Sequence, residues 1–184
     1  SVEEDLKRLV DEIRRRVEKV KRDLERIVDE NRKRVEESKE ESKKSVEEIE
    51  RRVREAAKRI SDERLIKTLR RIVEEVERVN REVLRKDDEL LRESEKVVTE
   101  VVKRLDEIVE RARKVVEEVA KRIRDEKVAD EVRKRLRKMI RDLEEVAREV
   151  KRELERLHEE TERSSRDAKR RSDKMARDLE RTEK

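Results

Sequence analysis

The first 60 residues of the chain keep one apolar spacing throughout and contain neither glycine nor proline. From Leu6 the inward positions advance in steps of 3-4-4-3-4, so that Leu6, Leu24, Ser42 and Ile60 are equivalent. Five steps span 18 residues, an average of 3.6 per step, which is the period of a straight α-helix. A seven-residue repeat would instead impose a left-handed supercoil. The spacing therefore predicts one long, straight amphipathic helix.

Composition alone would point to disorder, because 60% of the 184 residues are charged and none is aromatic. The regular apolar period argues against that interpretation, since a disordered chain has no reason to keep it. Glu, Lys, Arg, Leu and Ala are also strong helix formers. The combination is typical of coiled coils and other long-helix proteins.

Two similar stretches interrupt the inward pattern, ISDERLI at residues 60–66 and IRDEKVA at residues 123–129. In each, an aspartate (Asp62 or Asp125) can cap a new helix, and the glutamate after it favours the positive end of the helix dipole. We read both stretches as turns, which predicts helices over about 2–60, 63–123 and 126–183. Short turns make neighbouring helices antiparallel. The predicted fold is all-α: a single up-down-up three-helix bundle covering residues 1–184 as one domain.

In such a bundle the first and third helices are parallel, and the turns place residue i of the first level with about i+126 of the third. At this offset apolar residues meet apolar residues, and small polar residues meet small residues. The matched pairs include Leu6 with Val132, Val17 with Leu143, Leu24 with Val150, Ser42 with Ala168, Ser45 with Ser172 and Val53 with Leu179.

Polar residues replace apolar ones at inward positions near the middle of all three helices. An unpaired buried polar group costs about 1–3 kcal/mol, so several together must satisfy one another or hold water. We expect them to form buried hydrogen-bonded layers that penalise slipped registers. Two alternatives are that they lie at the bundle edge and face solvent, or that the small residues around Asp87 leave a recognition pocket. The set, called here the polar belt, is Asn31, Ser38, Ser42, Ser45, Asn80, Asp87, Ser94, Thr161, Ser165 and Ser172.

No pattern of catalytic or ligand-binding residues stands out. His158 is the single histidine, so HxxxH and HExxH metal motifs are absent from the sequence, and there is no cysteine. Phosphate-binding loops need glycine, which the chain lacks. Paired carboxylates do not mark a catalytic site here, because such pairs occur throughout a chain with 53 acidic residues. The sequence therefore predicts no enzyme, no cofactor, and no catalytic, cofactor-binding or metal-ligating residue.

The charges give little reason to expect a charged partner. A net charge of +5 remains from 58 basic and 53 acidic residues, and the signs are interspersed along every turn, so no strong basic field builds up. No apolar run approaches a membrane span, and no signal-peptide core is present. We expect a soluble protein, cytoplasmic on recombinant expression, that needs no partner and binds neither nucleic acid nor membrane.

Extra apolar residues on the second helix leave open a homo-oligomer in place of the expected monomer. They also suit the wide apolar stripe that a helix needs in a three-helix core. They are Val73, Leu84, Leu91, Val97, Val102, Val109 and Val115.

With its 18-residue repeat, its duplicated turn and its dense Glu/Lys/Arg surface, the whole chain resembles computationally designed parametric helical bundles. It is most similar to the untwisted three-helix type with buried hydrogen-bond layers, here Asn31, Ser38, Asn80, Asp87, Ser94 and Thr161. The resemblance implies a scaffold whose purpose is a stable fold, with no natural biochemical function. Such designs often have glycine or proline in their loops, which this chain lacks. Natural spectrin-like repeats are similar in topology but usually carry aromatic core residues. The alternative function is an interaction module, either a self-associating bundle or a helical adaptor.

Overall fold

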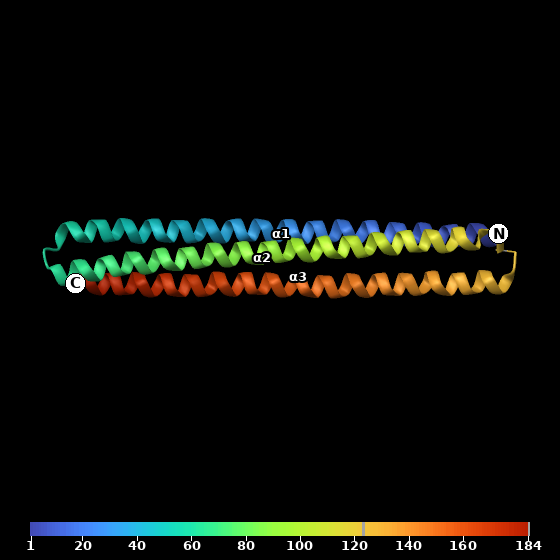
Figure 1. The fold of residues 1–184 in the computed structure, drawn as a ribbon. Helices are drawn as coiled ribbons and strands as arrows, with labels where there is room; N and C mark the ends of the chain where they lie inside the picture. The colour runs from blue at the N-terminus through green and yellow to red at the C-terminus, as the bar shows by residue number, and fades with distance from the viewer. Residues whose placement is uncertain (123, 184) are drawn as a thin grey trace. The chain divides into compact units, whose positions relative to one another are not determined.

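The computed structural model describes residues 1–122 and 124–183 and shows an all-α three-helix bundle, as predicted. Helix α1 covers Val2–Arg59, α2 covers Glu63–Val119 and α3 covers Glu126–Glu183 (Figure 1). The second helix ends earlier than predicted, because a 3-10 turn, η1 (Ala120–Arg122), follows it. Ile123, the start of the second predicted turn, lies outside the described residues.

Both predicted aspartate caps are present at the helix starts. The carboxylate of Asp62 accepts a hydrogen bond from the backbone N–H of Arg64 at 2.8 Å. The carboxylate of Asp125 accepts one from the N–H of Lys127 at 3.0 Å. Each satisfies one of the N–H groups that the first turn of a helix leaves without a partner. The glycine-free turns therefore rely on capping at the start of the next helix.

Removing either cap should destabilise the protein measurably. We expect Asp62→Ala and Asp125→Ala each to lower the free energy of unfolding by about 1 kcal/mol. Urea unfolding followed by circular dichroism measures the change. Asp11→Ala, an exposed position within α1, is the control and should stay within about 0.5 kcal/mol of the parent. Equal effects at all three positions would contradict the capping role.

The chain divides into two compact units, and each contains a segment of every helix. Unit 1 comprises Ser1–Asp29 with Ser94–Glu155, and unit 2 comprises Glu30–Glu93 with the chain from Arg156 onward.

In unit 1, ion pairs fix the direction of α3 relative to α1. Each joins residues 128 apart, so the two helices run in parallel. The residues lie one position outside predicted core pairs that are 126 apart, which places the charges along the edges of the apolar seam. The pairs are Arg16 with Glu144, Asp23 with Lys151 at 3.4 Å, and Asp5 with Arg133 at 3.6 Å.

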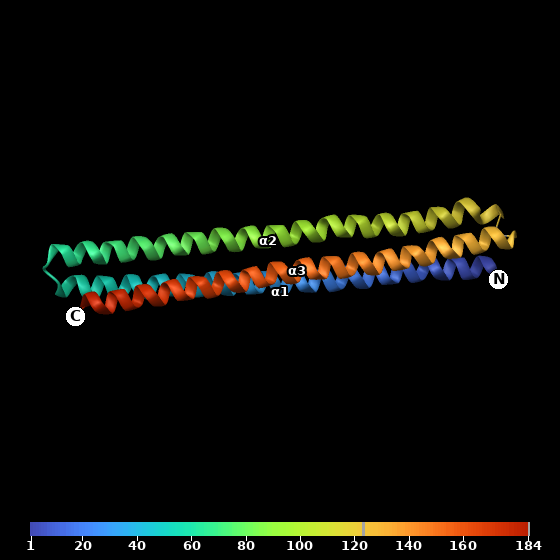
Figure 2. The same ribbon diagram turned by 90° about the horizontal axis from the view of Figure 1, so that it is seen from below.

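In unit 2, α3 is again parallel to α1, because Arg34 pairs with Glu162, also 128 residues apart. The α2 segment runs the other way. Position 39 of α1 contacts position 88 of α2, and position 42 contacts position 80, so the α2 number falls as the α1 number rises. The three segments lie side by side when seen from two directions (Figures 1 and 2).

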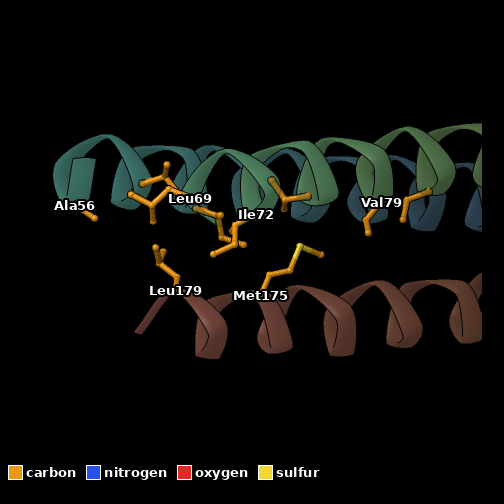
Figure 3. Packing of buried hydrophobic residues seen from close by; sticks show 10 residues of the cluster. Ala56, Leu69, Ile72, Val79, Met175 and Leu179 are labelled. Carbon is orange, nitrogen blue, oxygen red and sulfur yellow. The ribbon is translucent and has the colours of Figure 1, made fainter. Parts of the chain in front are cut away.

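Aliphatic side chains from all three helices fill the core of each unit. In unit 1, Leu6, Leu24, Leu105, Leu136 and Leu154 are completely buried. In unit 2, a cluster at the end nearer the α1–α2 turn brings together Ala56 of α1, Leu69 and Ile72 of α2, and Met175 and Leu179 of α3 (Figure 3). These side chains point toward one another, so each helix contributes one apolar face.

The apolar spacing predicts Leu9, Leu65 and Val116 as inward positions, but none of the three is buried. Leu65 is 36% exposed, because it lies in the first turn of α2, before the buried stripe begins at Leu69. At several levels the buried residue is the neighbour of the predicted one. Val10 is buried where Leu9 was expected, and Val115 where Val116 was expected. A wide apolar stripe offers two adjacent candidates per turn, and the spacing alone does not choose between them.

Candidate functional site

The polar belt is the strongest candidate for a site. Five of its residues are buried, and the other five are half-buried; none is exposed. Nine belong to unit 2, whereas Ser94 belongs to unit 1. The buried members are Asn31, Ser38, Asp87, Ser94 and Thr161, and the half-buried members are Ser42, Ser45, Asn80, Ser165 and Ser172.

A hydrogen bond joins two members of the polar belt across a helix interface. The hydroxyl of Ser42 on α1 donates to Oδ1 of Asn80 on α2 at 2.6 Å. Thr161 uses its hydroxyl differently, donating to the backbone carbonyl of Leu157 on its own helix at 3.1 Å. Thr161 is thus satisfied locally, without a partner on another helix.

Arg34 connects the polar belt to α3, and the sequence interpretation missed it. Its guanidinium pairs with Glu162 and donates a hydrogen bond to the hydroxyl of Ser165 at 3.0 Å. On its own helix it also lies within 4 Å of Glu37 and Glu41, at 3.9 Å and 3.7 Å. The Arg34 guanidinium holds the pKa of Glu162 below its usual range by stabilising the carboxylate. The offset of 126 pairs Val35 with Thr161. The signal in the sequence was the opposite charge of the residues next to them, Arg34 and Glu162.

Asp87 is the least satisfied member of the polar belt. It is completely buried, and neither carboxylate oxygen has a hydrogen-bonding partner of good geometry. Burial raises its pKa, and the Ser38 hydroxyl and the positive charges of Lys39 and Arg34 only partly oppose that shift. Lys39 contacts the neighbouring Asp88 at 2.5 Å. Asp87 is therefore a buried acid whose charged form is disfavoured.

Asn31 meets the single histidine. Oδ1 of Asn31 lies 3.1 Å from Nδ1 of His158. The other ring nitrogen, Nε2, lies 3.9 Å from the carboxylate of Glu162. The amide nitrogen of Asn31 is buried and has no partner. A continuous polar contact thus runs from Asn31 through His158 and Glu162 to Arg34 within unit 2.

A cavity of about 520 Å³ lies beside the serines of α1 and α3 in unit 2. Arg34, Arg166 and Lys169 border it, and Glu41 and Asp173 place opposite charges on the same border. Asp87 itself is not among the residues that line it. Serine hydroxyls, charges of both signs and the aliphatic side chains of Val83 and Ala168 line the cavity together. Its serines are Ser38, Ser42, Ser45, Ser165 and Ser172.

Among residues 1–122 and 124–183, no group of three or more His, Cys, Asp or Glu side chains is arranged to hold a metal ion. Within those residues, no helix is both long enough and apolar enough to cross a membrane.

Comparison with known proteins identifies no relative. No family model matches the chain, and no curated protein or solved structure is significantly similar to it.

Proposed function

We propose that the chain is a structural scaffold of artificial origin, without catalytic activity or a natural biochemical function. In this proposal, aliphatic burial supplies the stability and the polar belt selects one alignment of the helices. The observation that carries it is the constant offset between α1 and α3. Within each unit, every ion pair described above between these helices joins residues 128 apart and flanks a core pair.

The charged surface also supports a scaffold. Many of its ion pairs join residues three or four apart on one helix, as Arg51 does with Glu48 and Glu55. Such pairs stabilise a helix by a few tenths of a kcal/mol each, and each places opposite charges side by side. The absence of any matching family is consistent with a new sequence.

The main alternative is an interaction module that associates with a second copy through α2. Sedimentation equilibrium separates the two functions. A scaffold that acts alone should sediment as one species of 22.5 kDa at every concentration tested. A mass that rises with concentration toward twice that value would contradict the monomer and favour the interaction module.

Binding to polyanions is tested under the same conditions by adding duplex DNA or anionic vesicles at low salt. We expect no co-sedimentation, because acidic and basic residues are interspersed on each helix. Salt-sensitive co-sedimentation would contradict the proposal, since it would reveal a basic surface that binds phosphate.

A further inference from the structure

The cavity in unit 2 has an apolar wall that is continuous with the core. Val83 of α2 lines the cavity and belongs to the buried aliphatic cluster of unit 2, and Ala168 of α3 packs against the same cluster. On α1 the lining residues run from Arg34 to Ser45, roughly 16 Å along the helix. Its volume of about 520 Å³ lies within the range of about 300–1,000 Å³ that small-molecule sites occupy. The cavity can therefore hold a small organic molecule with an apolar body.

Hydrogen-bond donors gather where α3 borders this cavity. The hydroxyl of Ser165 accepts a hydrogen bond from Arg34 at 3.0 Å, so its own proton is available to a ligand. Arg166 and Lys169 follow on the same helix and also line the cavity. Neither makes an ion pair with a carboxylate of residues 1–122 and 124–183; Glu162, the acid near Arg166, is paired with Arg34. A hydroxyl, a guanidinium and an ammonium group are thus placed to receive an anion.

The acidic residues on the cavity border do not cancel its positive charge. Glu41 lies 3.7 Å from Arg34, and Asp173 lies four residues after Lys169. The lining includes three positive and two negative side chains, so it carries one net positive charge. This balance favours a ligand with a single negative charge over a cation.

We propose that this cavity binds a small aromatic carboxylate, a ligand that goes beyond the scaffold function proposed above. The carboxylate accepts hydrogen bonds from Ser165, Arg166 and Lys169, and the aromatic body lies against Val83 and Ala168. Contact with the aliphatic cluster removes the ring from water. An aromatic body suits the site better than an alkyl one, because guanidinium and ammonium groups also interact with the face of an aromatic ring.

The test titrates the full-length chain with 2-naphthoate and follows its methyl groups by NMR. The chain has no aromatic residue, so every ring-current shift of a methyl signal comes from the ligand. We expect saturable shifts at Val83 and Ala168, with a Kd of about 0.1–1 mM for a ligand of this size. Leu65, which is 36% exposed, is the internal control for non-specific association and should not shift. No saturable shift at Val83 and Ala168, or equal shifts at Leu65, would overturn the proposal.

The neutral analogue 2-naphthylmethanol keeps the aromatic body and lacks the charge. We expect it to bind at least about threefold more weakly than 2-naphthoate, since it loses the attraction of the cations on α3. Equal affinities for the two compounds would contradict an anion site.

One variant tests the position of the aromatic body. Ala168→Leu places a larger side chain in the cavity, next to the aliphatic cluster, and should abolish the shift at Val83. Ala57→Leu, the same change at an exposed position of α1, should retain it. Circular dichroism during urea unfolding shows that each variant is folded. Parental affinity in folded Ala168→Leu would place the ligand elsewhere and overturn the proposal.

A pair of double variants tests the anionic head and does not depend on filling the cavity. Arg166→Gln with Lys169→Gln should weaken 2-naphthoate binding about three- to tenfold, the range for two exposed ion pairs. Arg163→Gln with Arg170→Gln removes the same charge from exposed positions of α3 that do not line the cavity, and should keep the parental affinity. Equal weakening in both double variants would show that net charge alone attracts the ligand, which contradicts the proposed site.

Discussion

Replacing Asp87 with leucine is expected to raise the free energy of unfolding by about 1–3 kcal/mol at neutral pH, the cost of leaving a buried polar group unsatisfied. Both oxygens of this carboxylate are buried without a partner, whereas leucine would add to the apolar contacts. Urea unfolding measures the change. Asp87→Asn keeps the shape and removes the charge, so it should show part of the gain even if leucine is too large.

The gain should depend on pH, because burial raises the pKa of Asp87 above its unfolded value. Between the unfolded and folded pKa values, Asp87 therefore binds a proton when the chain folds. The protonated carboxyl group is the form that the buried position favours. Its stabilising contribution is full below the unfolded pKa and is lost as the pH rises through the folded pKa. The difference between Asp87→Leu and the parent should therefore be largest above the folded pKa and should shrink on acidification.

Asp88→Leu is the matched control one residue along the chain. Its carboxylate is 43% exposed and pairs with Lys39. Removing such a pair changes stability by no more than about 1 kcal/mol, and in the destabilising direction. A loss of stability in Asp87→Leu equal to that in Asp88→Leu would contradict the account of Asp87 as a buried, unsatisfied acid.

The second large effect is expected in the unit 2 core. Leu69→Ala should lower the free energy of unfolding by about 2–5 kcal/mol, because Leu69 is 1% exposed and the cavity it leaves lies inside a packed cluster. Leu65 is the control, one turn earlier on the same helix and 36% exposed. Leu65→Ala should cost less than about 1 kcal/mol. Similar losses at both positions would show that the α2 stripe faces a different direction.

The helices and their ends were largely predictable from the sequence, because the signals are local. Apolar spacing identifies a helix, and Asp62 and Asp125 mark the starts of α2 and α3 through bonds to backbone groups two residues away. The early end of α2 carried no such signal. The exposure of Leu65 was not predicted, because the apolar spacing indicates which face of α2 a residue lies on. It does not indicate at which residue along the helix that face becomes buried.

The polar belt was predictable only as a set of inward positions. Its burial pattern follows from helical periodicity, but its partners depend on side-chain geometry between helices. Asn80 receives a hydrogen bond from Ser42, whereas Asp87 receives none of good geometry. Arg34 was missed because one arginine among 58 basic residues is inconspicuous until the offset between α1 and α3 is known. The role of the belt in selecting the register stays a prediction.

The register itself can be measured with a spin label attached at Glu162→Cys, since the chain has no other cysteine. Paramagnetic broadening of α1 amide signals should show one maximum near Arg34, the contact partner of Glu162. In the same chain carrying Asp87→Leu and Asn80→Leu, we predict retained or raised stability with broadening spread over more than one maximum. A single, unshifted maximum in that variant would contradict the claim that these polar residues hold the helices in register.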